Sequence, residues 1–176
     1  MQQVKSAILT IRVAVAASIL LLCSNVGVAQ APASNNAQAT PAVTPTPDYH
    51  PSLGDLMTMA VQPRHTKLGL AGEARNWPYA QYELSELRNA FARIARTIPT
   101  YRNIDMTAVI AALTTEPLKA VEQAINAKDA GQFKSAYAQL TTTCNACHLS
   151  QDHPFVVIRI PGTSPYPDQD FRAPVR

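Results

Sequence analysis

The sequence predicts an all-α protein, an antiparallel up-down four-helix bundle with an extended C-terminal arm. Apolar residues recur at steps of three and four along most of residues 52–148, which is the spacing of amphipathic helices. Short connections separate these segments, and short connections favour antiparallel neighbours. Hydrophobic residues make up 47% of the 176 residues, and alanine, which favours helices, supplies much of that share. We expect no strand within residues 52–148.

Residues 1–29 have the pattern of a secretory signal peptide. Lys5 and Arg12 come before an apolar run, and the small residues Gly27 and Ala29 follow it. The run is shorter than the roughly 20 apolar residues that a membrane span needs. We therefore expect export to the periplasm and cleavage after Ala29, which leaves no stable membrane span. Retention of the signal as an anchor is the alternative.

Removal of the signal changes both the charge and the cysteine count. The full chain carries 15 basic and 12 acidic residues, and loss of Lys5 and Arg12 lowers its formal charge from +3 to +1. A nearly neutral protein has no electrostatic surface for nucleic acid, so no such partner is expected. Cys23 is removed as well, and the exported chain keeps only Cys144 and Cys147.

A linker and the first helix follow the signal. Residues 30–51 are rich in Ala, Pro and Thr and almost uncharged, a composition typical of flexible linkers. Ser52 and Asp55 form a capping arrangement for the first helix. Helical spacing then continues through Met57, Val61, His65 and Leu68. Pro63 kinks this helix or divides it in two, and Gly72 marks its end.

The second helix has the clearest pattern of the four. Asn76 is the expected N-cap, Pro78 lies in the first turn, and Pro99 stops the helix. The apolar seam between them consists of Ala80, Leu84, Leu87, Phe91, Ile94 and Ile98.

The third helix opens at Asp105, and Pro117 either kinks it or begins a separate helix. The fourth helix begins at Asp129, with Gln132 as its capping partner, and completes a bundle domain over residues 52–148.

Residues 149–176 form the predicted arm, laid along the bundle in extended conformation. Its apolar run, residues 155–160, is rich in β-branched side chains. A disordered terminus is the alternative, but it would leave this run exposed as an aggregation hazard.

The stretch "CNACH" carries the chemistry of the chain. Cys144, Cys147 and His148 share one face of the fourth helix, because residues three and four apart are neighbours on a helix. C-x-x-C-H is the signature of c-type haem attachment. In such a site each cysteine forms a thioether with one haem vinyl group, and the histidine binds the iron. We therefore predict one covalent haem c, held by Cys144 and Cys147 and ligated by His148.

Three other interpretations of the motif are weaker. A structural zinc site wants four Cys or His ligands, which only a cramped set of Cys144, Cys147, His148 and His153 would supply. A redox dithiol expects a βαβ context that the helical pattern does not provide. A plain disulfide is the normal fate of two exported thiols that nothing else uses.

Four helices with C-x-x-C-H near the end of the last one resemble the cytochrome c′ superfamily of exported bundle cytochromes. The chain is also similar to small exported cytochromes that carry stretches like "RHTKLGLAG", "NWPYAQYELSEL", "KDAGQFKSAYAQLTTTCNACH" and "PFVVIRIP". The resemblance covers about residues 52–171. It implies that Cys144 and Cys147 hold the haem, that His148 is the proximal ligand, and that two copies pair through their first two helices as a homodimer.

The sixth iron ligand is expected from the first helix. In an antiparallel bundle the end of the fourth helix lies near the start of the first. At a rise of 1.5 Å per residue, Met57 is closer in height to His148 than His65 is. The resemblance also implies a distal residue from the first helix. We predict Met57 as the ligand, with Met59, His65 and an open distal side as alternatives.

Arg64, Lys67 and Arg75 are candidates for pairing with the haem propionates, although solvated charges on a helix face are the simpler interpretation. No nucleophile–base pair or carboxylate pair indicates hydrolysis, so no enzymatic activity is expected. The predicted function is one-electron transfer with an unidentified redox partner protein. The alternatives are a five-coordinate haem protein that binds NO or CO, and an interaction module whose haem is structural or lost.

Overall fold

The computed structural model describes residues 48–174 of the chain. The predicted signal peptide and residues 30–47 of the predicted linker lie outside these residues. The described part is mainly helical, which confirms the all-α prediction. Its helical elements are α1 (Leu53–Leu56), η1 (Met57–Val61), α2 (Gln62–Glu73), α3 (Trp77–Thr97), α4 (Met106–Ala127) and α5 (Ala130–Ser150).

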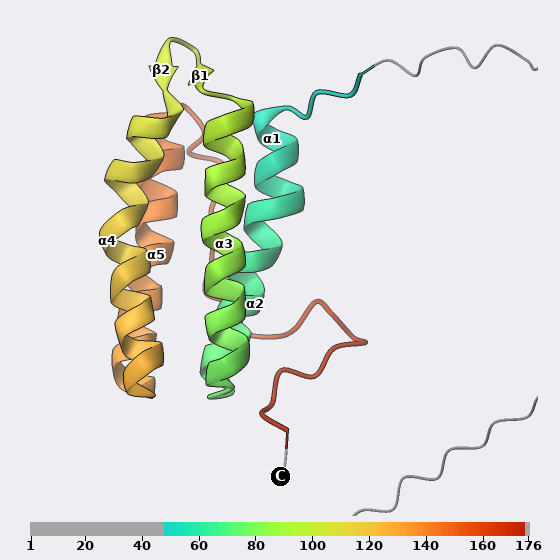
Figure 1. The fold of residues 1–176 in the computed structure, drawn as a ribbon, viewed down its shortest axis with the longest axis vertical. Helices are drawn as coiled ribbons and strands as arrows, with labels where there is room; N and C mark the ends of the chain where they lie inside the picture. Colours follow the sequence, from blue (N-terminus) through green and yellow to red (C-terminus); the bar gives the residue numbers. More distant parts are fainter. Residues whose placement is uncertain (1–47, 175–176) are drawn as a thin grey trace, which may run out of the picture. The chain divides into compact units, whose positions relative to one another are not determined.

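The long helices lie side by side around one apolar core (Figure 1). Along the chain α2 packs on α3, α3 on α4 and α4 on α5, and α5 also contacts α2. The largest of the fully buried apolar side chains are Leu68, Leu84, Leu87, Ile94, Val121 and Leu140. The predicted seam of α3 supplies three of these six, so its spacing identified the buried face correctly.

The first helix neither breaks nor ends at Pro63. The capping arrangement is present, with the Asp55 backbone N–H donating to Ser52 Oγ at 3.1 Å. Helical structure then runs without interruption through α1, η1 and α2, but η1 is a π-helical segment in which the Gln62 N–H donates to the Met57 carbonyl. Pro63 has no N–H, and its ring would clash with the carbonyl four residues earlier in a regular helix. The wider turn directly before Pro63 accommodates the ring without dividing the helix.

A two-stranded hairpin joins α3 to α4, so the expectation of no strand was wrong. Thr100–Tyr101 (β1) pairs antiparallel with Ile104–Asp105 (β2). Arg102 and Asn103 between them have φ values of 48° and 67°. Positive φ at both central residues is the conformation of the type I′ turn, one of the two common two-residue hairpin turns. Strands of two residues are too short to show an alternating sequence pattern.

The third helix is continuous through Pro117, which settles the choice that the sequence left open. The fourth helix begins as predicted, because Asp129 Oδ1 accepts the backbone N–H of Gln132 at 2.9 Å. It ends at Ser150, two residues beyond the predicted boundary at 148.

Gly72 does not end α2; it lets α2 and α5 approach each other. The helix runs one residue further, and Arg75 then takes the left-handed conformation with φ of 55°. A Cβ atom added at Gly72 would lie 2.0 Å from the ring of Phe133 on α5. At Gly69, one turn earlier, it would lie 2.5 Å from the hydroxyl of Tyr137. The rings of Phe133 and Tyr137 therefore occupy the space that a side chain at Gly72 or Gly69 would need.

The C-terminal arm, residues 151–174, has no helix or strand; its first part runs along the helices and its last part loops away from them in this view (Figure 1). The Asn145 side chain on α5 donates to the Ile158 carbonyl at 2.9 Å and accepts a hydrogen bond from the Ile158 backbone N–H at 2.7 Å. Further along, the Asn76 side chain donates to the carbonyl of Phe171, whose ring is buried. Docking of the arm does not bury its apolar run, since Phe155 and Val157 remain 78% and 63% exposed.

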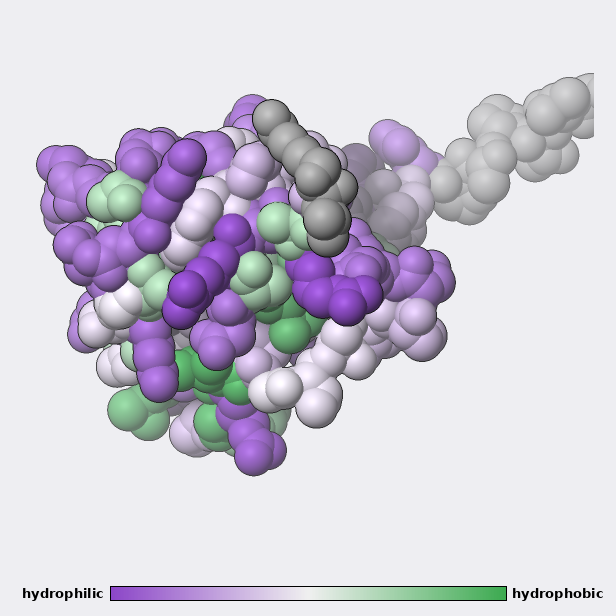
Figure 2. Space-filling model, turned by 90° about the horizontal axis from the view of Figure 1, so that it is seen from below, coloured by the Kyte–Doolittle hydropathy of each residue, from purple (hydrophilic) through white to green (hydrophobic). Residues whose placement is uncertain are grey.

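The face seen in Figure 2 is mostly hydrophilic, with hydrophobic residues gathered toward its lower edge. None of the helices found between residues 48 and 174 combines the length and apolarity needed to cross a membrane.

We expect Gly72→Ala to destabilise the protein by about 2 kcal/mol, because the new methyl group overpacks the α2–α5 contact. This loss outweighs the gain in helix propensity of up to about 1 kcal/mol. Gly54→Ala is the matched control, since a Cβ there would meet only Ser52 Oγ at an ordinary 3.7 Å. Urea unfolding monitored by circular dichroism measures both, and equal stability of the two variants would contradict the close contact.

Candidate functional site

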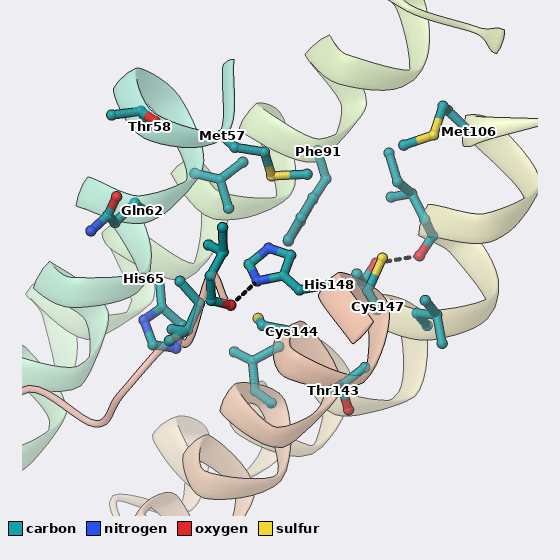
Figure 3. Close-up of a pocket in the computed structure, with 17 residues that line it drawn as sticks. Met57, Thr58, Gln62, His65, Phe91, Met106, Thr143, Cys144, Cys147 and His148 are labelled. Carbon is teal, nitrogen blue, oxygen red and sulfur yellow. Dashed lines mark hydrogen bonds between the residues drawn. The ribbon is translucent and has the colours of Figure 1, made fainter. Parts of the chain in front are cut away.

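A mainly apolar cavity lies between the helices and the start of the arm (Figure 3). It leaves about 840 Å³ unfilled by atoms, part of it open to solvent. Every long helical segment and the arm contribute to its wall. The lining residues are Met57, Thr58, Val61, Gln62, His65, Phe91, Met106, Ile110, Leu113, Thr114, Leu140, Thr143, Cys144, Cys147, His148, Val156 and Ile158.

The two cysteines reach this cavity from the last turns of α5, together with His148 (Figure 3). Neither cysteine forms a disulfide. Burial raises the pKa of the Cys144 thiol to about 11, and burial also raises the pKa of Cys147. Both are therefore protonated at neutral pH. Protonated thiols are poor nucleophiles, which disfavours the redox-dithiol interpretation.

His148 is oriented by the arm. Its Nδ1 lies 2.8 Å from the Val156 carbonyl oxygen (Figure 3). A carbonyl can only accept, so Nδ1 carries the proton and donates it. In a neutral imidazole the lone pair then lies on Nε2, the free nitrogen. This is the usual arrangement of a metal-binding histidine, whose second nitrogen is held by a backbone carbonyl or carboxylate.

The arm forms one wall of the cavity, and its successive side chains point alternately into the cavity and to solvent. Val156 and Ile158 line the cavity, whereas Phe155 and Val157 point to solvent. Successive side chains of an extended segment point in opposite directions, so two hydrogen bonds to Asn145 suffice to fix which pair faces inward.

The structure separates the three predicted distal candidates. Met57 lines the cavity from η1, and its side chain extends toward the space beside His148 (Figure 3). Met59 is 61% exposed and is absent from the cavity wall, so it is wrongly placed for a ligand. Met106, at the start of α4, also lines the cavity. Sequence spacing did not single it out.

His65 reaches the cavity wall but uses both ring nitrogens elsewhere. His65 Nε2 lies 3.0 Å from the Thr141 hydroxyl, and Nδ1 lies 3.1 Å from the Tyr137 hydroxyl. The Thr141 hydroxyl donates to the Tyr137 carbonyl at 2.9 Å, and the Tyr137 hydroxyl donates its single proton to the His65 carbonyl at 2.7 Å. Iron ligation by His65 would break this network.

The basic residues proposed for the propionates do not line the cavity. Arg64 pairs with the buried carboxylate of Glu83 at 3.2 Å and with Glu86 at 3.5 Å. Lys67 lies over the ring of Tyr166, 4.6 Å from its centroid. Arg75 is the left-handed residue after α2. Arg64 and Lys67 thus have partners from α3 and from the arm.

His153 does not join the cysteines either. It lies in the turn after α5, where Nδ1 is 2.6 Å from the Gln151 carbonyl. Within residues 48–174, no group of three or more His, Cys, Asp or Glu side chains is arranged to hold a metal ion.

Sequence reasoning missed Phe91, Thr141 and Tyr137 as parts of the site or its support. Phe91 was assigned to the α3 seam, and it is buried there as well as lining the cavity. Thr141 and Tyr137 stand four residues apart on α5, one and two turns before Cys144. That spacing was visible in the sequence, but their partner is 72 to 76 residues away.

Burial lowers the pKa of His65 from 6.5 to about 4 on folding. Between these values the unfolded chain binds a proton that the folded chain does not, so stability is complete above pH 6.5 and falls as pH drops toward 4. The expected loss is about 3 kcal/mol. Urea unfolding at pH 7 and pH 4 measures it. Between pH 7 and pH 4 the free energy of unfolding of His65→Gln should decrease by about 3 kcal/mol less than that of the wild type. An equal decrease in both proteins would contradict the lowered pKa of His65.

Comparison with known proteins finds no matching family model, no matching curated sequence and no matching solved structure.

Proposed function

We propose that the chain is an exported c-type cytochrome that carries one electron at a time on a single haem, thioether-linked to Cys144 and Cys147 and ligated by His148. One observation carries the proposal. Two protonated thiols and an imidazole with a free Nε2 meet on one wall of an apolar cavity, and a thioether side chain, Met57, faces the same space.

The residues fit such a group in three respects. The wall is almost entirely apolar, as a porphyrin face requires. Cys144 and Cys147 have their sulfur–hydrogen bonds intact for addition across two vinyl groups, a step that needs no oxidant. The cavity is partly open to solvent, which would leave one edge of a bound haem within reach of a redox partner. When bound, the haem supplies a metal centre that gains and loses an electron.

The chain's own residues would set how that centre behaves. The hydrogen bond from His148 to Val156 fixes the ring and its tautomer, and such bonds tune ligand basicity. Met57 is the proposed sixth ligand, because it is the first-helix candidate with a free ligating atom at the cavity. If His148 and Met57 both held the iron, they would suit electron transfer. The apolar wall excludes water, which also adjusts the potential.

We also propose that the helices form an antiparallel up-down bundle of the cytochrome c′ type. Short connections between consecutive helices support this arrangement, as does the contact between α5 and α2. Location in the periplasm and exchange of electrons with a protein partner belong to the same proposal. They rest on the pattern of residues 1–29, which the structure does not describe, and on the chemistry of the motif.

The second candidate is a five-coordinate haem protein that binds NO or CO. It is favoured by the position of Met57 on a π-helical turn, since such turns are irregular insertions that often occur at functional sites. A ligand carried by an irregular turn is easier to displace than one on a regular helix.

Covalent attachment is tested with the full chain matured in a periplasm that loads haem. The wild-type chain should retain an intense haem absorption band after acid–organic extraction, and mass spectrometry should show one added haem. Replacement of both Cys144 and Cys147 by alanine should make the haem extractable, while His153→Ala should leave attachment unchanged. A wild-type chain without a haem band would refute the proposal.

The sixth ligand is tested by the spectrum of the reduced protein with and without CO. Sharp α and β bands that CO does not change are expected for the wild type and for Met59→Ala, the exposed control. Met57→Ala should give broad bands that shift with CO, because an axial position opens. If the wild type itself responds to CO, the five-coordinate candidate replaces electron transfer.

A further inference from the structure

The first part of the arm presents an unpaired strand edge. Its hydrogen bonds to α5 use the Val156 carbonyl and both backbone groups of Ile158. In an extended segment the peptide groups of alternate residues point to opposite sides, so those of Val157 and Arg159 point away from α5. In the part of the chain that the structure describes, no hydrogen bond reaches the N–H or the carbonyl of these two residues. An edge of this kind is a template for pairing with another strand.

A groove lies beside this edge, between the arm and α2. Gln62 and Thr66 belong to its α2 side, and Val157 and Arg159 belong to its arm side. The Gln62 side chain is exposed, and its amide has no hydrogen-bond partner among residues 48–174. On the opposite edge of the arm, the amide of Asn145 binds both an N–H and a carbonyl of the main chain. A strand placed in the groove would therefore find main-chain partners on the arm and a free amide on α2.

The side chains around the groove indicate what kind of strand it fits. Phe155, Val157 and Arg159 share the solvent-facing side of the arm, because residues two apart in an extended segment point the same way. Phe155 and Val157 are exposed apolar side chains. Arg159 is the only arginine, lysine, aspartate or glutamate in the described wall of the groove, and no carboxylate of residues 48–174 pairs with it. A complementary strand therefore carries a carboxylate opposite Arg159 and an apolar side chain opposite Val157.

We propose that the groove binds an extended acidic segment of a partner protein, which pairs antiparallel with the arm as an added strand. One residue of the segment exchanges two main-chain hydrogen bonds with Val157, and the residue two positions before it exchanges two with Arg159. Main-chain pairing of this kind supplies affinity, and the alternate side chains supply specificity. The proposal does not rest on the proposed haem, because neither Val157 nor Arg159 lines the haem cavity.

The test measures the binding of fluorescein-labelled synthetic peptides to the full exported chain by fluorescence anisotropy. The peptide Ser-Glu-Thr-Val-Thr-Val-Ser places its glutamate opposite Arg159 and its first valine opposite Val157. It should bind saturably, and the same peptide with lysine in place of glutamate should bind about fivefold more weakly. Methylation of the amide nitrogen of the first valine, which faces the arm, should abolish binding. Methylation of the threonine after it, whose N–H faces away from the arm, should weaken binding much less.

Two variants of the chain test the role of charge. Arg159→Glu should reverse the preference, so that the lysine peptide binds more tightly than the glutamate peptide. Arg93→Glu is the matched control, because Arg93 is an exposed α3 residue that lines neither the haem cavity nor the groove. It should leave the affinity for both peptides unchanged. Circular dichroism checks that both variants are folded.

Three results would overturn the proposal. The first is no saturable binding of the glutamate peptide at concentrations up to about 1 mM. The second is equal binding of the peptide methylated at its first valine. The third is a wild-type chain that sediments as a dimer and becomes a monomer in Arg159→Glu, which would assign the groove to a second copy of this chain. None of these results bears on the haem, which the absorption spectrum tests separately.

Discussion

The contact between α2 and α5 is the constraint on which the site depends. Gly69 and Gly72 leave room on α2 for the rings of Tyr137 and Phe133 on α5, at distances that no Cβ would permit. Close approach of the two backbones brings His65 within hydrogen-bond distance of Thr141. Cys144 follows Thr141 by one helical turn, so the same contact determines where α5 presents its thiols.

The buried polar side chains around the α2–α5 contact have hydrogen-bond or ion-pair partners. His65 and Thr141 are buried and satisfy each other through a network that includes Tyr137. Glu83 is almost fully buried on α3 and is paired with Arg64. Leaving such groups unpaired would cost several kcal/mol each. Arg64 is therefore paired with the protein's own carboxylate, and the described wall of the cavity contains no arginine or lysine side chain.

The cavity owes its composition to two irregular features. The π-helical turn η1, placed directly before Pro63, carries Met57 into the wall. The arm, which has no regular structure, contributes Val156 and Ile158 and orients His148 through a backbone carbonyl. Regular helices supply the thiols and most of the apolar surface. Segments without a repeating hydrogen-bond pattern thus supply the parts that adapt the cavity to a particular ligand.

The sequence by itself was enough to predict the features that depend only on residues within one helical turn. The caps at Ser52, Asn76 and Asp129 formed as expected, because their hydrogen bonds close within three residues. The shared face of Cys144, Cys147 and His148 follows from the same local geometry.

Only the tertiary structure decided which faces meet. The role of Gly72, the partners of Arg64 and His65, and the inward side of the arm all rest on contacts between residues 13 to 76 positions apart. The spacing of residues along a helix shows which side chains share one face of that helix. The residues that pack against this face belong to other segments, so the pattern of one helix cannot identify them.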